Sequence, residues 1–254
     1  MGSPRSVAGE CVAVSAEGAD DVSATYARLV LASLLAAYPG REFEEEVELL
    51  LGALAARAAE RGDEFGLAEV VGAYAAVKRS EAFDDLRSDY IDTFDRGRQR
   101  TSLSESEYGR ERVLAKGQTL ADVCAFYSAF GLEFGGGEGH GDMADHLAVE
   151  LEFYALMCLK HETLAALWDE NGAAIVADAC GQFLLAHLGR IPGVVAARPV
   201  IAEHAFYGPA FRFIAAVVAS ECARWGVTPE PVEWLTKLDT DDPVGCGHAA
   251  TEVA

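Results

Sequence analysis

The sequence predicts an all-α protein, a single helical-bundle domain of about nine or ten helices. Hydrophobic residues make up 51% of the 254 residues, so a large core can form. Alanine is abundant and runs of Val, Ile and Thr are scarce, which favours helices over sheets. Hydrophobic residues also recur with the helical period along almost the whole chain, without strand alternation or an internal repeat.

The first part of the chain shows four apolar stripes with helical spacing. The first stripe ends at Pro39-Gly40, a pair that stops helices. Glutamates crowd the start of the second stripe, where the helix dipole favours acidic side chains. The expected helices therefore cover Tyr26–Ala37, Phe43–Leu54, Leu67–Val77 and Phe83–Phe94.

A polar break follows, and it leads into two shorter predicted helices. Ser104 and Glu107 have the spacing of a capping box, which predicts a short helix through Lys116. Gly117 is expected to interrupt that helix. The next stripe runs from Leu120 to Phe130, and Gly131 is expected to close it.

The second half of the chain begins with the glycine-rich run Gly135–Gly141. We expect residues 132–141 to be a hinge between two sub-bundles. A long helix is predicted from about Asp142 to Trp168 and is ended by Asn171-Gly172, and a connection over Gly189–Pro199 separates the later helices. These later helices are expected at Ile175–His187 and Tyr207–Trp225, with a short tail helix at Pro231–Leu238. The helical domain then spans residues 21–238, between flexible tails over residues 1–20 and 239–254.

The net charge is strongly negative, with 41 acidic against 20 basic residues and a formal charge of −21. Such a surface repels nucleic-acid phosphates and anionic membranes, and it attracts cationic peptides. The N-terminus lacks the apolar run of a secretory signal, and no stretch reaches the roughly 18 apolar residues of a membrane span. The six cysteines form no CxxC pair. A cytoplasmic protein with reduced thiols and no stable membrane insertion is expected.

No set of residues indicates catalysis, a metal site or a cofactor. The glycine run lacks the Lys-Ser/Thr of a phosphate-binding loop. His161-Glu162 would need a second histidine at position 165, which is Ala165, to form a zinc-protease helix. Cys246-x-His248 has no second pair of ligands, and Glu150 and Glu152 point in different directions on a helix. We therefore expect a protein that binds another polypeptide rather than an enzyme.

The segment Asp145–Phe153 resembles the characteristic motif of the TorD/DmsD/NarJ family of molybdoenzyme maturation chaperones. In that family an acidic residue, His and Leu precede a Glu-Leu-Glu-Phe run, which here reads Asp145-His146-Leu147 and then Glu150-Leu151-Glu152-Phe153. Further similar segments occur in the family's order over roughly residues 24 to 226. They are Tyr90–Phe94, Ser104–Tyr108, Tyr127–Gly131, Phe183–Leu188 and Phe206-Tyr207.

The resemblance implies a system-specific chaperone without a cofactor of its own. Such chaperones bind the catalytic subunit of a molybdenum oxidoreductase, often by its twin-arginine signal peptide. They hold the subunit until the molybdopterin guanine dinucleotide cofactor is inserted, before assembly or export. A binder of such a peptide needs an apolar groove with acids at its rim.

The candidate client-binding residues follow from this role. Four aromatic side chains are expected to line the groove, although the core is the alternative place for each: Tyr90, Phe94, Tyr108 and Tyr127. Three acids are expected to meet the two arginines: Glu105, Glu107 and Asp145. Ser106, His146 and Glu150 complete the predicted site, with Asp145 in the first helical turn and His146 one turn before Glu150.

Departures from the family pattern leave the client open. Thr93 stands where a leucine is usual, and Gly189-Arg190-Ile191-Pro192 stands where a tryptophan is often found. A monomer and a domain-swapped dimer both fit the sequence. Two other functions also stay open: a small all-helical metal- or cofactor-binding enzyme, suggested by scattered His and Cys, and a helical scaffold or regulator without a molybdoenzyme client.

Overall fold

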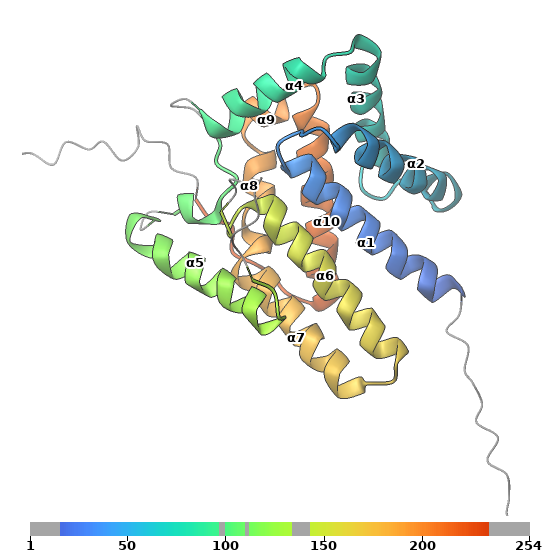
Figure 1. Ribbon diagram of the computed structural model, residues 1–254, viewed down its shortest axis with the longest axis vertical. Helices are drawn as coiled ribbons and strands as arrows, with labels where there is room; N and C mark the ends of the chain where they lie inside the picture. The colour runs from blue at the N-terminus through green and yellow to red at the C-terminus, as the bar shows by residue number, and fades with distance from the viewer. Residues whose placement is uncertain (1–15, 97–99, 110–111, 134–142, 234–254) are drawn as a thin grey trace, which may run out of the picture.

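The computed structural model describes residues 16–96, 100–109, 112–133 and 143–233, and within these it contains ten α-helices and no β-strand (Figure 1). This architecture confirms the all-α prediction. The helices are α1 (Ala16–Ala36), α2 (Phe43–Arg61), α3 (Leu67–Ser80), α4 (Phe83–Tyr90), α5 (Arg112–Ala129), α6 (Leu147–Ala166), α7 (Glu170–Ala186), α8 (Pro192–Ala196), α9 (Pro199–Ala202) and α10 (Tyr207–Trp225). Three short segments accompany them: the π-helix η1 (Ile91–Asp95) and the 3₁₀ turns η2 (Glu105–Glu107) and η3 (Leu188–Arg190).

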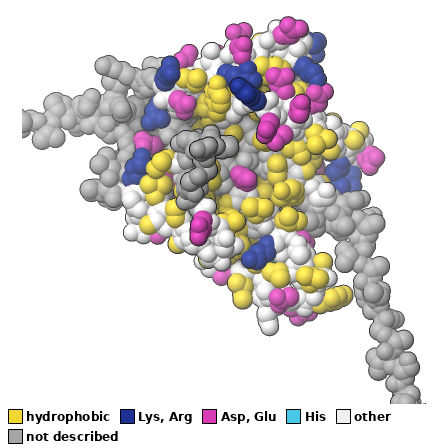
Figure 2. Space-filling model, in the orientation of Figure 1, with side chains coloured by type: hydrophobic (Ala, Val, Ile, Leu, Met, Phe, Trp, Pro, Cys, Tyr) yellow, Lys and Arg dark blue, Asp and Glu magenta, His cyan; other side chains and the backbone are white. Residues whose placement is uncertain are grey.

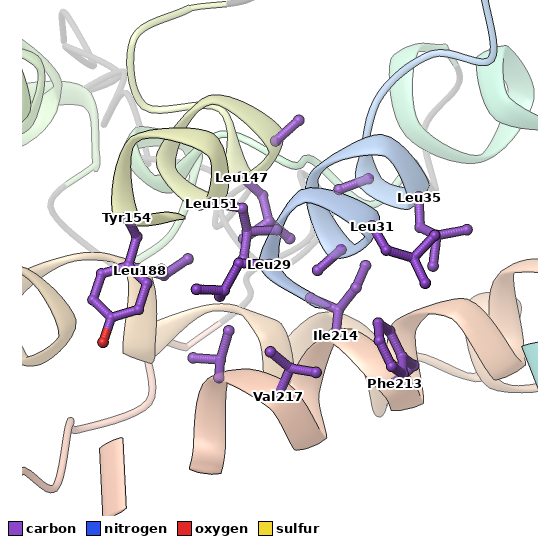
Figure 3. Close-up of a cluster of buried hydrophobic side chains, with 14 of the residues drawn as sticks. Leu29, Leu31, Leu35, Leu147, Leu151, Tyr154, Leu188, Phe213, Ile214 and Val217 are labelled. Carbon is purple, nitrogen blue, oxygen red and sulfur yellow. The ribbon is translucent and has the colours of Figure 1, made fainter. Parts of the chain in front are cut away.

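The centre of the core is formed by α1, α6 and α10. The leucines on the inner face of α1 contact α6 and α10, and none of the central side chains is exposed to solvent by more than 3%. Each buried side chain of this size stabilises the fold by about 1.5–3 kcal/mol. Figure 3 shows the cluster, which includes Leu29, Leu31 and Leu35 from α1, Leu147, Leu151 and Tyr154 from α6, and Phe213, Ile214 and Val217 from α10.

The remaining helices cover this centre. α2 packs on α1, and α3 and α4 continue from α2 at one end of the molecule (Figure 1). α7 packs on α6, and α5 lies at the outer edge beside η2 and α7. The start of α6 is thus flanked by α1 on one side and by the η2 segment on the other, an arrangement that positions the candidate site.

Two predicted boundaries in the middle of the chain are wrong. Ser104 makes no side-chain capping bond, and η2 covers only three residues, so the capping box does not form. α5 runs from Arg112 to Ala129 straight through Gly117, which is tolerated inside a helix at a cost of about 1 kcal/mol. Gly131, with φ +77°, follows the end of α5 as expected.

The long helix α6 begins and ends inside its predicted bounds. It starts at Leu147 because His146 is its N-cap, so Asp145 precedes the helix rather than lying in its first turn. It ends at Ala166, and Asp169 caps α7 by accepting a bond from the Gly172 N–H at 2.9 Å. Asn171 and Gly172 therefore lie inside α7 and do not end α6.

The later segments differ from the prediction in detail. The connection from Gly189 to Pro199 contains η3, α8 and the start of α9, so it is largely helical. Ile175 lies on the outer side of α7 and is 71% exposed. Residues 231–233 are not helical, and residues 234–238 of the predicted tail helix lie outside the described residues. The predicted hinge is described only at residues 132 and 133.

No single described helix is long and apolar enough to cross a bilayer. The pair Glu170–Ala186 and Leu188–Ala196 satisfies both requirements together, with a bend of 41° between its parts.

Candidate functional site

Most polar residues of the predicted site lie where the segment before η2 meets the segment before α6. The Leu147 N–H donates to the Leu103 carbonyl at 2.8 Å, and the Glu105 N–H donates to the Asp145 carbonyl at 2.9 Å. Ser104 and His146 pair as an isolated antiparallel bridge between these bonds. Residues about 40 positions apart in the sequence are thereby fixed side by side, by backbone bonds that the sequence pattern does not reveal.

Three carboxyl groups converge behind this junction. Glu105 is 4% exposed, and Asp145 and Glu150 are fully buried. We call Glu105, Asp145 and Glu150 the acid cluster. Asp145 accepts a bond from the Ser106 N–H at 2.8 Å, so its carboxylate holds η2 against the start of α6. The sequence pointed to all three acids, and the fold brings them together.

Two basic groups from the end of α7 and from η3 face the acid cluster. His187 Nδ1 lies 2.8 Å from Glu105 Oε2, and Arg190 donates to Glu105 Oε1 at 3.0 Å. His187 is buried, whereas the Arg190 side chain is 34% exposed and reaches the surface. A buried carboxylate requires such partners because the charge is otherwise strongly destabilised.

Glu150 differs from its two neighbours because neither of its oxygens has a hydrogen-bond partner among the described residues. Burial, followed by the charges of Glu105 and Asp145, raises the pKa of Glu150 well above its usual range, while Arg190 opposes the rise. The carboxyl group is therefore held in its neutral form to a higher pH than an exposed glutamate.

Other acceptors of the site are also unused within the described part of the chain. The Asp145 Oδ1 atom and the Ser106 Oγ atom are buried and make no hydrogen bond there. Each such buried polar atom costs about 1–3 kcal/mol when it is left without a partner. The acid cluster therefore has spare capacity to accept hydrogen bonds from an incoming donor.

The other polar residues of the predicted site have different surroundings. The His146 ring accepts the Ala148 N–H at 3.3 Å and so caps α6. Glu107 is half-buried outside the acid cluster and pairs with Lys116 at 2.9 Å and with Arg100 at 3.8 Å. His146 thus contributes to the site by capping the start of α6, and Glu107 belongs to the neighbouring surface.

Tyr108 and Tyr127 border the acid cluster. Their hydroxyls donate to the carbonyls of Ser102 and Ala144, both at 2.6 Å. The bond to Ala144, the residue before Asp145, places the Tyr127 hydroxyl beside the cluster. Burial raises the pKa of Tyr127, and the charge of Glu150 adds to that rise. Both tyrosines are buried, so in this conformation they support the site from within rather than line a surface groove.

Tyr90 and Phe94 lie in a separate part of the core. Their rings pack on each other with a centroid distance of 4.9 Å, and on those of Tyr207 and Phe211 with centroid distances of 5.1 to 6.1 Å. The Tyr90 hydroxyl donates to the Ala36 carbonyl at 3.1 Å, which satisfies its polar atom in the interior. Both are 2% exposed, so the core position considered for them is the one observed. Client contact by these residues stays a prediction.

Sequence reasoning missed the two basic partners of the cluster. His187 and Arg190 are 82 and 85 residues from Glu105, so no local spacing links them. Buried acids require basic partners, and this requirement predicts that such partners exist. It does not identify which basic residues of the sequence they are.

Sequence reasoning also missed a surface groove on the opposite side of the α6 start. It lies between α1, α2 and α6 and has a volume of about 490 Å³. Its lining combines apolar residues with exposed acids, and Figure 2 shows hydrophobic side chains gathered over α1 and α6 with acidic ones beside them. We call it the α1–α2–α6 groove. It is lined by Tyr26, Val30, Ser33, Leu34, Ala37, Glu42, Glu46, Leu49, Leu50, Ala148, Val149, Glu152 and Leu156.

Among the described residues, no group of three or more His, Cys, Asp and Glu side chains is arranged to hold a metal ion. Cys246 and His248 lie outside these residues. The chemistry that the described site offers is therefore the acceptance of hydrogen bonds and positive charge by carboxyl groups.

The family model described as nitrate reductase delta subunit matches residues 41–190. The chain belongs to this family. The matched region contains η2, α5, α6 and α7, and it includes every member of the acid cluster together with His187 and Arg190. A search of curated proteins finds no match.

Membership confirms the resemblance seen in the sequence motifs. The family consists of chaperones of molybdoenzyme maturation rather than enzymes, and it implies a catalytic subunit of the nitrate reductase type as the partner. The family assignment therefore favours a binding role for the acid cluster over a catalytic one.

Proposed function

We propose that this chain is a cytoplasmic chaperone that binds the twin-arginine signal peptide of a molybdenum oxidoreductase catalytic subunit. It holds the subunit until molybdopterin guanine dinucleotide has been inserted, before assembly or export. The family assignment supports the chaperone role, and the formal charge of −21 supports attraction of a basic leader.

The observation that carries the proposal is the unused acceptor capacity of the acid cluster. Asp145 Oδ1 and both oxygens of Glu150 lack partners within the described residues, although they are fully buried. A guanidinium group carries five N–H donors in a planar fork that fits carboxylates. A client arginine would therefore supply what this cluster lacks, a positive charge and several donors at once.

Arg190 indicates how such an arginine enters. Its guanidinium already occupies one side of the cluster, and it is the partly exposed member of the network. Asp145 and Glu150 are inaccessible in this conformation, so a client arginine reaches them by displacing Arg190 or by moving the Leu103–Tyr108 segment outward. Arg190 also donates to the Ala186 carbonyl at 3.2 Å, and this bond is available to it after displacement.

The test is co-expression of the full chain with catalytic subunits of nitrate-reductase-type molybdoenzymes, followed by pull-down. We expect a subunit with its leader to be retained, and replacement of the leader's two arginines by lysine to reduce retention. Lysine keeps the positive charge but cannot form the two parallel N–H bonds of a guanidinium. One hydrogen bond to a charged group contributes about 1.5–3 kcal/mol, so a loss of about tenfold or more is expected. Failure of the chain to retain any such subunit would reject the function.

The site is tested with Asp145→Asn, which removes the charge but keeps an oxygen that can accept the Ser106 N–H. Retention should fall about tenfold while the unfolding midpoint stays close to that of the unchanged protein. The matched control is Asp85→Asn, on the exposed start of α4. Full retention by Asp145→Asn and by the double variant Asp145→Ala/His146→Ala would show that the site is assigned wrongly.

A further inference from the structure

The α1–α2–α6 groove combines two surface features that are unfavourable for a protein left alone in water. Leu49 on α2 is 74% exposed, and Leu156 on α6 is 39% exposed. Between them lie half-buried apolar side chains of α1 and α6, including Val30, Leu34 and Val149. Exposed apolar area costs about 25 cal/mol per Å², so covering this surface is favourable.

The acids of the groove lack the ion-pair partners that some other surface acids have. Glu42, Glu46 and Glu152 are exposed, and no hydrogen bond or ion pair joins their carboxylates to the described residues. The residues lining the groove include no Lys, Arg or His. Elsewhere on the surface, acids form ion pairs: Glu48 with Lys78, Glu69 with Arg212, Asp84 with Arg87 and Glu162 with Arg224.

The charge of the groove selects among the possible occupants. An anionic lipid surface or a nucleic acid would meet only negative charge at this rim. A second copy of the chain would bring a further formal charge of −21 against it. A segment with an apolar stripe and basic flanks complements both the floor and the rim.

We propose that the α1–α2–α6 groove receives an amphipathic helical segment of the client polypeptide. Its apolar side chains contact Leu49 and Leu156, and its basic side chains pair with Glu42, Glu46 and Glu152. Amphipathic helices bind apolar grooves in this way through side chains spaced three and four residues apart. The proposal rests on the proposed function for the identity of the partner, but it concerns a surface that the acid cluster does not share.

The two sites lie on different sides of α6. Glu150 and Leu151 point into the protein and are fully buried, whereas Val149 and Glu152 lie at the groove. The Ser33 hydroxyl donates to the Ala148 carbonyl at 2.8 Å and holds α1 against α6 at the groove floor. Substitutions of exposed groove residues can therefore be made without disturbing the acid cluster.

The test uses a synthetic peptide of about 18 residues with one apolar helical face of Leu and Ala and with Arg and Lys at both flanks. Its binding to the full chain is measured by fluorescence anisotropy. A peptide of the same composition, with the apolar residues scrambled out of helical register, is the control for nonspecific charge attraction. We expect the amphipathic peptide to bind at least about tenfold more tightly.

Two pairs of variants locate the binding surface. Leu49→Gln should weaken binding, whereas Leu167→Gln, at a position that is 70% exposed but outside the groove, should not. Glu46→Lys/Glu152→Lys should weaken it by about tenfold, whereas Glu60→Lys/Glu203→Lys, with the same change of net charge at other exposed sites, should have little effect. Equal effects of variant and control in both pairs would overturn the proposal.

A photo-crosslinking residue at position 49 identifies the occupant directly. In the full chain, crosslinks to the apolar face of the peptide, and to a segment of a co-expressed client, support the proposal. Crosslinks to residues 1–15 of this chain, to a second copy or to phosphatidylglycerol vesicles would overturn it. Undiminished client retention by the groove variants rejects this inference alone, whereas the absence of any retained client rejects the proposed function.

Discussion

The acid cluster and the α1–α2–α6 groove both adjoin the start of α6, yet they use carboxyl groups in opposite ways. In the cluster the acids are buried and hold segments of the fold together, as Glu105 does with His187 and Arg190. In the groove the acids are exposed, and their carboxylates form no hydrogen bond or ion pair with the rest of the described chain. On one side of α6 the acids thus stabilise the fold and keep buried acceptors without partners, whereas on the other side they are exposed to solvent.

This difference shows that the net charge of a chain does not identify its binding acids. A buried charge is stable only when it is paired or neutralised, so the surrounding residues must supply a partner for it or keep the group neutral. An exposed carboxylate is solvated and can exchange water for a ligand at little cost. Three predictions test whether the two regions are separated in this way.

The largest effect on stability is expected for Glu105→Ala. Removal of this carboxylate leaves buried His187 and part-exposed Arg190 without their acidic partner. Breaking a buried pair costs about 3–5 kcal/mol, and the exposure of Arg190 favours the lower end of that range. Urea unfolding should therefore show a loss of about 3 kcal/mol. Glu107→Ala, which removes a half-buried surface pair, should cost less than about 1 kcal/mol; equal losses would contradict the contrast.

A smaller, pH-dependent effect is expected for Glu150→Gln. Because the folded state raises the pKa of Glu150, the stabilisation linked to its protonation is complete below the unfolded pKa of about 4.3. That contribution is lost as the pH rises through the folded pKa. At pH values between the pKa of Glu150 in the unfolded state and its pKa in the folded state, the free energy of unfolding falls by about 1.4 kcal/mol per pH unit. The glutamine variant lacks this loss.

The measurement is the unfolding free energy of both proteins from pH 5 to pH 9, since their difference cancels the other titrating groups. The difference should grow with pH in favour of Glu150→Gln. A difference that stays constant over the range would show that Glu150 titrates normally and that the cluster does not hold it neutral.

The smallest effect on stability is expected for Glu46→Lys/Glu152→Lys in the groove. Glu46 lies in the first turn of α2, where reversing its charge costs about 0.3–1 kcal/mol, and Glu152 is exposed. Thermal and urea unfolding should therefore show a total loss below about 1 kcal/mol. A loss comparable with that of Glu105→Ala would mean that the groove acids are structural.

Local signals in the sequence predicted most of the helices. The stripes that begin at Tyr26, Phe43, Leu67 and Tyr207 each lie in an observed helix, because one apolar face must be buried against the bundle. One boundary failed because a tertiary contact replaced the expected cap. The Ser104 side chain caps nothing because its backbone pairs with His146, and that pairing also delays the start of α6.

The candidate site was predictable only in part. The resemblance selected Glu105, Asp145 and Glu150, and the structure places them together, although their binding of a client stays a prediction. The expectation that these aromatic side chains line a surface groove did not consider that buried backbone carbonyls can accept bonds from tyrosine hydroxyls. Tyr90, Tyr108 and Tyr127 each donate to one, which allows a tyrosine to be buried completely.

By itself the sequence determined the helical class, the acidic surface and the family motif. These properties depend on composition and on spacings of a few residues, within the reach of one helix turn or one short segment. Only the tertiary structure decided which bases meet the acid cluster and that α1, α2 and α6 enclose a groove. Both depend on contacts between residues tens to more than a hundred positions apart, whose proximity arises from packing and not from local spacing.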